Sequence, residues 1–145
     1  MKFKLAVAVA ALSVGFVGMA VGQDDPIPAR QELMKMNGAA MKKVGAMVKG
    51  ETPYNATEAA DAMKIIADDM TEFPSLFPTG SDQGDTKAGE AIWSDTAGFQ
   101  AAAAKLMTDA KAAQEAAGGG LETFSPAFEQ VAANCGGCHK IYREK

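Results

Sequence analysis

The chain has 145 residues, of which 48% are apolar, 22% charged and 7% aromatic, and its formal net charge is −4. This length suits one domain with its own hydrophobic core, and the Ala, Met and Leu content favours helices over a sheet. No basic run follows the first few residues, so the charge pattern gives little support to a nucleic-acid partner.

The first 22 residues have the features of a secretory signal peptide. A cationic start, Met1 to Lys4, precedes an uncharged apolar run from 5 to 21. Small residues follow at Ala20 and Gly22, the positions that a signal peptidase reads, and a polar segment begins at Gln23. A membrane anchor is the alternative, because the apolar run is near the lower limit for spanning a bilayer.

We therefore expect residues 1–22 to be removed near Gly22 and residues 23–145 to form a periplasmic domain without stable membrane insertion. Loss of Lys2 and Lys4 leaves 12 basic against 18 acidic side chains, so the mature chain carries a charge of −6.

The first helix is predicted from about 27 to 49. Pro26 and Pro28 suit a helix start, and Gly50 suits its end. Its apolar stripe consists of Leu33, Met34, Met41, Val44 and Val48.

The second helix is predicted from about 56 to 73, with Thr57 as its cap. Its apolar stripe consists of Met63, Ile66, Met70 and Phe73. The segment 74–89 follows as a long loop with two prolines and three glycines. A loop of this length in a small domain often covers a functional site.

The third helix is predicted from about 90 to 117, and the run Gly118 to Gly120 ends it. Apolar residues recur in it every seven positions, which is typical of a heptad-like packing seam. The seam consists of Ile92, Phe99, Leu106 and Ala113, with Thr96, Ala103 and Ala110 between them.

The fourth helix is predicted from about 121 to 143, with an apolar stripe at alternating spacings of three and four. The stripe includes both cysteines of the chain. Four amphipathic helices joined by short links predict an all-α fold, an antiparallel four-helix bundle. The members of the stripe are Leu121, Phe124, Phe128, Val131, Cys135, Cys138 and Tyr142.

The sequence Cys135-Gly136-Gly137-Cys138-His139 has the C-x-x-C-H spacing at which a c-type haem is attached. Residues i, i+3 and i+4 share one face of a helix. Two thiols can therefore add to the two vinyl groups of one porphyrin, while the next residue projects an imidazole at the iron. The two glycines are expected to keep the surface small, so that the ring can approach the backbone. The motif predicts one haem c, covalently attached through two thioethers.

Three different roles for the motif compete with haem attachment. A thioredoxin-like redox pair belongs in a βαβ unit, which the predicted elements lack. A zinc site needs four ligands, and the chain offers only these three of the usual type. A disulfide suits an exported chain, but the short loop between Cys135 and Cys138 gives little stabilisation.

The chain resembles the class II c-type cytochromes, the cytochrome c′ family, over roughly 28–145. The haem motif lies near the C-terminus and is followed by Tyr142 and Arg143, matching the family pattern C-x-x-C-H-x-x-aromatic-basic. The segment 30–34 resembles the family's Arg-x-x-x-Leu/Met on the distal side of the haem. The segments 76–78 and 91–93 resemble its loop and the entry to its third helix.

The resemblance implies a role for each residue that matches the motif. Cys135 and Cys138 match the thioether cysteines, and His139 matches the proximal iron ligand. Arg143 matches a basic residue near that imidazole, where positive charge helps to set the reduction potential.

Three further residues are expected to border the haem. Arg30 and Gln31 match residues beside the haem edge and its propionates, where an arginine can pair with a carboxylate in fork geometry. The alternative for Arg30 is an ordinary exposed helix charge. Lys87, in the long loop, is expected to touch the haem rim.

Met34 stands at the position that decides between two functions in the family. A residue that does not bind iron leaves a five-coordinate, high-spin haem open to small gases, whereas a bound methionine gives a six-coordinate, low-spin haem suited to electron transfer. The segment 34–51 looks more like the low-spin, methionine-ligated relatives, so Met34 is expected to be the distal ligand. Core packing is the alternative role for Met34, and Leu33 is its non-ligating neighbour.

The expected function is a periplasmic one-electron carrier, and the mature acidic surface suits redox partner proteins with a basic patch. The alternative is a five-coordinate cytochrome c′ that binds nitric oxide or carbon monoxide. An enzyme is not expected, because the single His is used on iron and the distal neighbours are expected to be apolar. Family members often form antiparallel homodimers through their first two helices, so the resemblance allows a homodimer.

Overall fold

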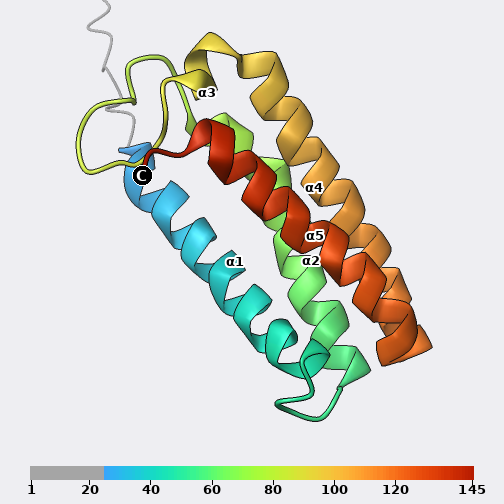
Figure 1. Ribbon diagram of the computed structural model, residues 1–145. Helices are drawn as coiled ribbons and strands as arrows, with labels where there is room; N and C mark the ends of the chain where they lie inside the picture. The colour runs from blue at the N-terminus through green and yellow to red at the C-terminus, as the bar shows by residue number, and fades with distance from the viewer. Residues whose placement is uncertain (1–24) are drawn as a thin grey trace, which may run out of the picture.

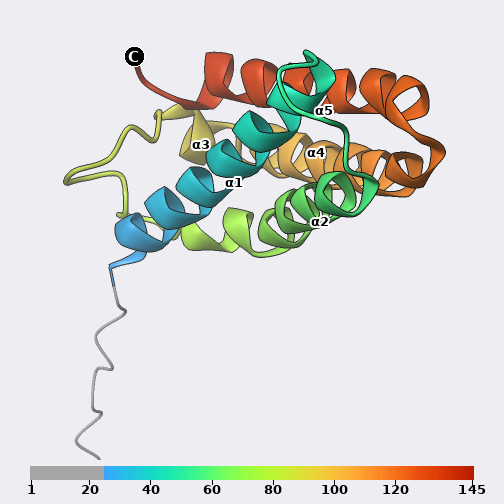
Figure 2. The same cartoon turned by 90° about the horizontal axis from the view of Figure 1, so that it is seen from below.

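The computed structural model describes residues 25–145, and the predicted signal peptide with its cleavage site lies outside them. Within this range four long helices pack side by side as an antiparallel bundle (Figures 1 and 2). The all-α four-helix fold is thus confirmed. The elements are α1 (Pro26–Val48), α2 (Ala56–Glu72), η1 (Phe73–Leu76), α3 (Ala91–Ser94), α4 (Thr96–Ala116), η2 (Ala117–Gly119) and α5 (Leu121–Tyr142).

The side chains just before α1 and α2 each accept a hydrogen bond from one free backbone N–H of the first turn. The carboxylate of Asp25 accepts from the N–H of Ile27 at 3.0 Å at the start of α1. Asn55 accepts from the N–H of Glu58 at 3.1 Å at the start of α2. The prediction that Thr57 caps α2 is wrong. The helix already begins at Ala56, and the residue before it, Asn55, is the cap.

The predicted third helix is two helices, α3 and α4, separated at Asp95. Its backbone leaves the helical region at φ −128° and ψ 55°, and its carboxylate accepts from the N–H of Gly98 at 3.1 Å. A short polar side chain that caps a new helix competes with continuing the old one. At the other end the prediction is confirmed: α4 gives way to η2, and Gly120 takes φ 86°, which glycine adopts without strain.

The predicted stripes of the second and fourth helices lie in the core. Met63, Ile66, Phe124 and Val131 are almost completely buried. The seam of α4 is buried at Phe99, Leu106 and the alanines, whereas Thr96 is exposed. Small alanines let α4 approach α2 closely along its length. These alanines are Ala59, Ala62 and Ala67 on α2, and Ala103, Ala110 and Ala113 on α4.

The buried face of α1 differs from the predicted stripe. Val44 is fully buried, but Leu33, Met34, Met41 and Val48 are only partly buried. Two polar residues, Arg30 and Asn37, take buried positions instead. This difference arises because the first half of α1 faces a cavity rather than a packed core.

The long loop between η1 and α3 lies beside the start of α1 and the end of α5 (Figure 1). The N–H of Gly89 donates to the carbonyl of Tyr142 at 2.9 Å, and the N–H of Glu144 donates to the carbonyl of Lys87 at 2.9 Å. These bonds join the loop to the C-terminal end of the chain. No helix within residues 25–145 is both long enough and apolar enough to cross a membrane.

Candidate functional site

A cavity of about 630 Å³ lies between α1, α2, α4 and α5, and the long loop borders one end of it. This volume is typical of a small-molecule site, and the lining is mainly apolar. All the residues that the sequence singled out for a site line this one cavity. They are Arg30, Gln31, Met34, Lys87, Cys135, Cys138, His139 and Arg143.

The C-x-x-C-H motif lies in the last turns of α5. Cys135 and Cys138 are half-buried and not bonded to each other, so the structure does not contain the alternative disulfide. Burial raises the pKa of both thiols, and Cys135 raises the pKa of Cys138 further. Thiols that stay neutral lack the low pKa that marks a reactive redox pair. Within residues 25–145 no group of three or more His, Cys, Asp or Glu side chains could hold a metal ion.

Gly136 and Gly137 are exposed and do not line the cavity, and a Cβ at either position would have no atom of the protein within 4 Å. On a helix these two positions point away from the face that carries the cysteines. That their small size lets the ring approach the backbone stays a prediction.

From the register of the antiparallel helices α1 and α5 we infer that Met34 and His139, which both line the cavity, lie at similar levels along it. Gly45 of α1 approaches Phe128 of α5, since a Cβ on Gly45 would be 3.9 Å from the Phe128 ring. The two helices are antiparallel, so the direction towards the loop runs back along α1 and forward along α5. Eleven residues in that direction lead from Gly45 to Met34 and from Phe128 to His139. Eleven residues are about three turns, so both side chains keep the facing direction of the first pair. Leu33, one position earlier than Met34, does not line the cavity.

Arg30 is 4% exposed, so it is not an ordinary surface charge. Its Nε donates to the carbonyl of Leu76 at 2.7 Å, its Nη1 donates to the carbonyl of Ser81 at 2.9 Å, and its Nη2 donates to the Ser81 hydroxyl. The guanidinium also lies over the Phe77 ring, 4.1 Å from the centroid. Burial lowers the pKa of Arg30, against the effect of Asp25. Arg30 therefore holds the long loop in place, and pairing with a propionate remains a prediction.

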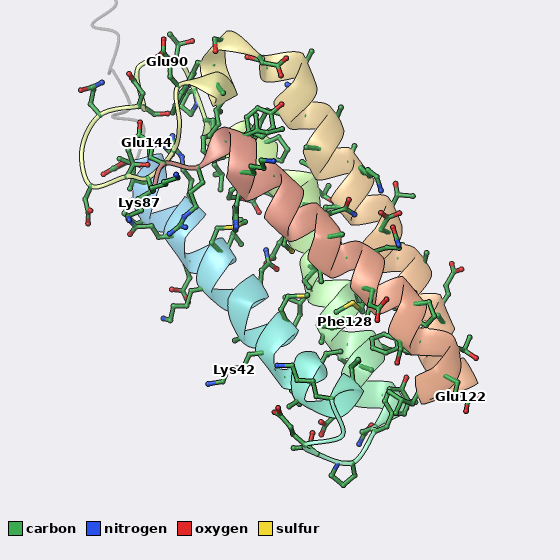
Figure 3. All side chains as sticks on the ribbon, in the orientation of Figure 1. Lys42, Lys87, Glu90, Glu122, Phe128 and Glu144 are labelled. Atoms are coloured by element: carbon green, nitrogen blue, oxygen red, sulfur yellow. The ribbon has the colours of Figure 1, made fainter. Side chains whose placement is uncertain are left out.

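The remaining cationic residues gather at the same end of the cavity as Arg30. Lys87 comes from the loop, and Arg143 is bridged to the loop at Ala88. Gln31 donates from Nε2 to the carbonyl of Asp85 at 2.8 Å. Figure 3 shows Lys87 and Phe128 towards opposite ends of the bundle. This end of the cavity suits the carboxylates of a ligand.

His139 lines the cavity and is also accessible to solvent. Partial burial lowers its pKa, and the nearby charge of Arg143 lowers it further. A neutral imidazole is the form that binds a transition metal. Cavity, thiols, imidazole and cationic end together fit a haem that is attached through Cys135 and Cys138.

Two features of the site were missed by the sequence patterns. Tyr142 donates to the carboxylate of Asp95 at 2.9 Å, which links the end of α5 to the start of α4. Burial, and then the hydrogen bond to Asp95 and its charge, raise the pKa of Tyr142. The expectation of wholly apolar distal neighbours is also wrong, since Asn37 lines the cavity one turn after Met34 and is 8% exposed. Asn37 follows Met34 by three residues and so lies on the same face of α1. The predicted stripe of this helix omitted it because only apolar residues were included.

Comparisons with known proteins find similar chains over most of the length of this one. A family model described as cytochrome C′ matches residues 25–143. The chain is 37% identical to cytochrome c′ of Rhodopseudomonas palustris, over 100% of this chain and 99% of that protein. A solved structure of cytochrome c′ from Rhodopseudomonas palustris has a TM-score of 0.80, with 36% identity over 85% of this chain and 98% of that chain. A nitric oxide complex of a mutant of cytochrome c prime from Alcaligenes xylosoxidans has a TM-score of 0.76, with 27% identity over 83% of this chain and 94% of that chain.

Proposed function

The chain belongs to the cytochrome c′ family of class II c-type cytochromes, and from this premise we propose that it is an exported haem protein that binds a diatomic gas, nitric oxide or carbon monoxide. Its cofactor is one covalently attached haem c. When bound, the haem supplies an iron that changes between ferric and ferrous states and holds axial ligands.

Different residues of the cavity would hold different parts of the haem. Cys135 and Cys138 would hold the haem through the two thioethers, and the imidazole of His139 would be its proximal ligand. Arg143 and Lys87 lie at the end that suits the propionates. The mainly apolar cavity walls suit the apolar faces of the ring.

The observation that carries the gas-binding proposal is the set of side chains that line the cavity together with His139. Met34 and Asn37 of α1 line it, and among its lining residues within 25–145 His139 is the one imidazole and Lys87, from the loop, the one lysine. A side-chain amide is a poor ligand of haem iron and a thioether is a weaker one than an imidazole, so a diatomic gas can take the sixth position. The structural relative whose description names a nitric oxide complex supports the same choice.

A second candidate is the one-electron carrier with Met34 as sixth ligand. The presence of Met34 and His139 in the lining of one cavity favours it, because a thioether and the proximal imidazole would then both be available to one iron. The names of the relatives favour the gas-binding protein, and the comparisons give the Met34-ligated carrier no support.

Absorption spectra of the ferric and dithionite-reduced protein, together with Met34→Leu and Met34→Ala, separate the two candidates. The gas-binding proposal predicts broad high-spin spectra that both substitutions leave high-spin. A sharp low-spin spectrum that becomes high-spin in Met34→Ala would establish the carrier and reject the proposal. Met47→Leu, a buried substitution on α1 outside the cavity, controls for altered helix packing.

Location and assembly complete the proposal. Export to the periplasm follows from the predicted signal peptide and from family membership. The acidic mature surface would direct any redox partner to dock through a basic patch. A homodimer remains a prediction, and light scattering of the purified protein tests it by giving twice the mass of one chain.

A further inference from the structure

We propose that Asn37 binds the gas: its side-chain amide donates a hydrogen bond to the diatomic ligand held at the haem iron. This inference rests on the proposed function and adds a residue that discriminates between ligands. The placement of one buried amide in the cavity wall carries it.

Asn37 is the buried polar side chain that the fold leaves without a partner in this cavity. It is 8% exposed, and neither its Nδ2 nor its Oδ1 makes a hydrogen bond. Buried amides in folded proteins are nearly always hydrogen-bonded, because leaving water without a new partner costs stability. The other polar groups nearby are already used: Arg30 and Gln31 donate to the long loop. An acceptor inside the cavity would give the Nδ2 of Asn37 the hydrogen-bond partner that it lacks.

A bound haem would offer two kinds of acceptor, its propionates and its gas ligand, and the position of Asn37 favours the gas ligand. Asn37 follows Met34 by three residues, so the two share one face of α1, one turn apart. The register of α1 and α5 places Met34 near the level of His139 in the cavity that both residues line. Asn37 is seven residues from Arg30, or about 10 Å along the helix axis. It is thus removed from the cationic end that suits the propionates, and a ligand on the face opposite His139 is the acceptor left.

The chemistry of the ligand fits an amide donor. Diatomic gases bound to ferrous haem draw electron density from the iron, so their outer atom accepts a hydrogen bond. Nitric oxide draws more density than carbon monoxide and gains more from the donor. An amide does not titrate, so this preference is independent of pH across the range in which the protein is folded.

The infrared C–O stretch of the ferrous carbon monoxide complex measures the hydrogen bond directly. Asn37→Leu removes the donor at similar volume, and Asn37→Met does so with a side chain that adapts to irregular space. Both are expected to move the stretch to higher wavenumber and to speed nitric oxide dissociation about two- to tenfold, the factor that one neutral hydrogen bond supplies. Met47→Leu, buried on α1 outside the cavity, is expected to leave both unchanged.

The outcomes separate this inference from the function on which it rests. If the wild-type protein forms no carbon monoxide complex, both the gas-binding proposal and the role of Asn37 are rejected. If the complex forms but neither Asn37 variant shifts the stretch, gas binding stands and the hydrogen bond is rejected. Because either variant suffices, failure of one to incorporate haem leaves the other to decide.

Discussion

Arg30 is a charge that the sequence places on a helix and the structure places in the interior. The carbonyls of Leu76 and Ser81 and the face of Phe77 satisfy it there. A planar guanidinium can serve several acceptors at once in a fixed fork, which an ammonium group cannot. Among the side chains of α1, Arg30 therefore makes the most contacts with the loop that borders the cavity, and Gln31 adds one hydrogen bond.

Replacing Arg30 by Leu is expected to lower the free energy of unfolding by at least about 2 kcal/mol, since charge-assisted hydrogen bonds are lost and buried carbonyls are left unpaired. Arg30→Lys is expected to restore only part of this. Urea denaturation of the holoprotein measures both. Lys35→Leu on the exposed side of α1 is the control, with a change within about 0.5 kcal/mol. Equal effects of Arg30→Leu and Lys35→Leu would contradict the anchoring role.

Asp69 of α2 is a carboxylate held in an unfavourable place. Its Oδ2 is buried without a hydrogen-bond partner, and burial, then Asp68 and Glu72, raise its pKa. A raised pKa means that the folded state prefers the protonated form. The stability that this group contributes is complete below its unfolded pKa and is lost as the pH rises through its folded pKa.

Asp69→Asn is therefore expected to raise the urea midpoint at neutral pH, and the gain is expected to shrink as the pH falls towards the unfolded pKa of an aspartate. Asp68→Asn is the matched control, because Asp68 is exposed and paired with Lys64. A gain from Asp69→Asn that is the same at every pH would show that charge burial is not its cause.

Among single residues, the sequence predicted those whose chemistry is tied to spacing. Cys135, Cys138 and His139 are recognisable because thioether attachment and iron ligation demand that separation on a helix. Asn37 was missed because a polar residue at a buried position looks the same in sequence as one on the surface. Its burial depends on α1 facing a cavity, which is a property of the whole bundle.

At the scale of elements, the positions of the long helices followed from apolar periodicity, and the break at Asp95, which periodicity missed, is made by a cap. Heptad spacing continues through Asp95 without a break, since Ile92 and Phe99 are both buried. The split into α3 and α4 depends on local hydrogen bonds that Asp95 accepts from Gly98 and from Tyr142. Apolar periodicity indicates which face of a helix is buried. It does not detect the break at Asp95, because the buried residues keep the same spacing on both sides of it.

Asp95→Ala is expected to destabilise the protein by about 0.5–2 kcal/mol through loss of the cap, and further through loss of the acceptor for Tyr142. Tyr142→Phe removes only the second contribution, about 0.5–1.5 kcal/mol. A double-mutant cycle by urea denaturation isolates their coupling. Strictly additive effects would show that the link between α4 and α5 contributes nothing.

For the whole molecule, the sequence predicted the bundle and the cofactor but not the cavity that joins them. The bundle follows from four amphipathic stripes, and the haem from one motif. Which wall would face His139 depends on the register between α1 and α5, set by contacts such as that of Gly45 with Phe128. Registers between helices arise from packing, which one stripe alone does not encode.

Export and attachment predict a definite mature molecule. Mass spectrometry of the protein from its natural host is expected to show a chain beginning at Gln23 with one haem added covalently. Fragmentation is expected to place the haem on the peptide with Cys135 and Cys138. A chain that keeps residues 1–22 would reject cleavage, and a haem-free chain with an oxidised cysteine pair would reject attachment.

The central claim is that the face opposite His139 is open to a diatomic gas, and addition of nitric oxide to the reduced protein tests it most directly. An open face predicts an immediate change of the visible spectrum that saturates at one nitric oxide per chain. A reduced spectrum with sharp low-spin bands that nitric oxide leaves unchanged would contradict it.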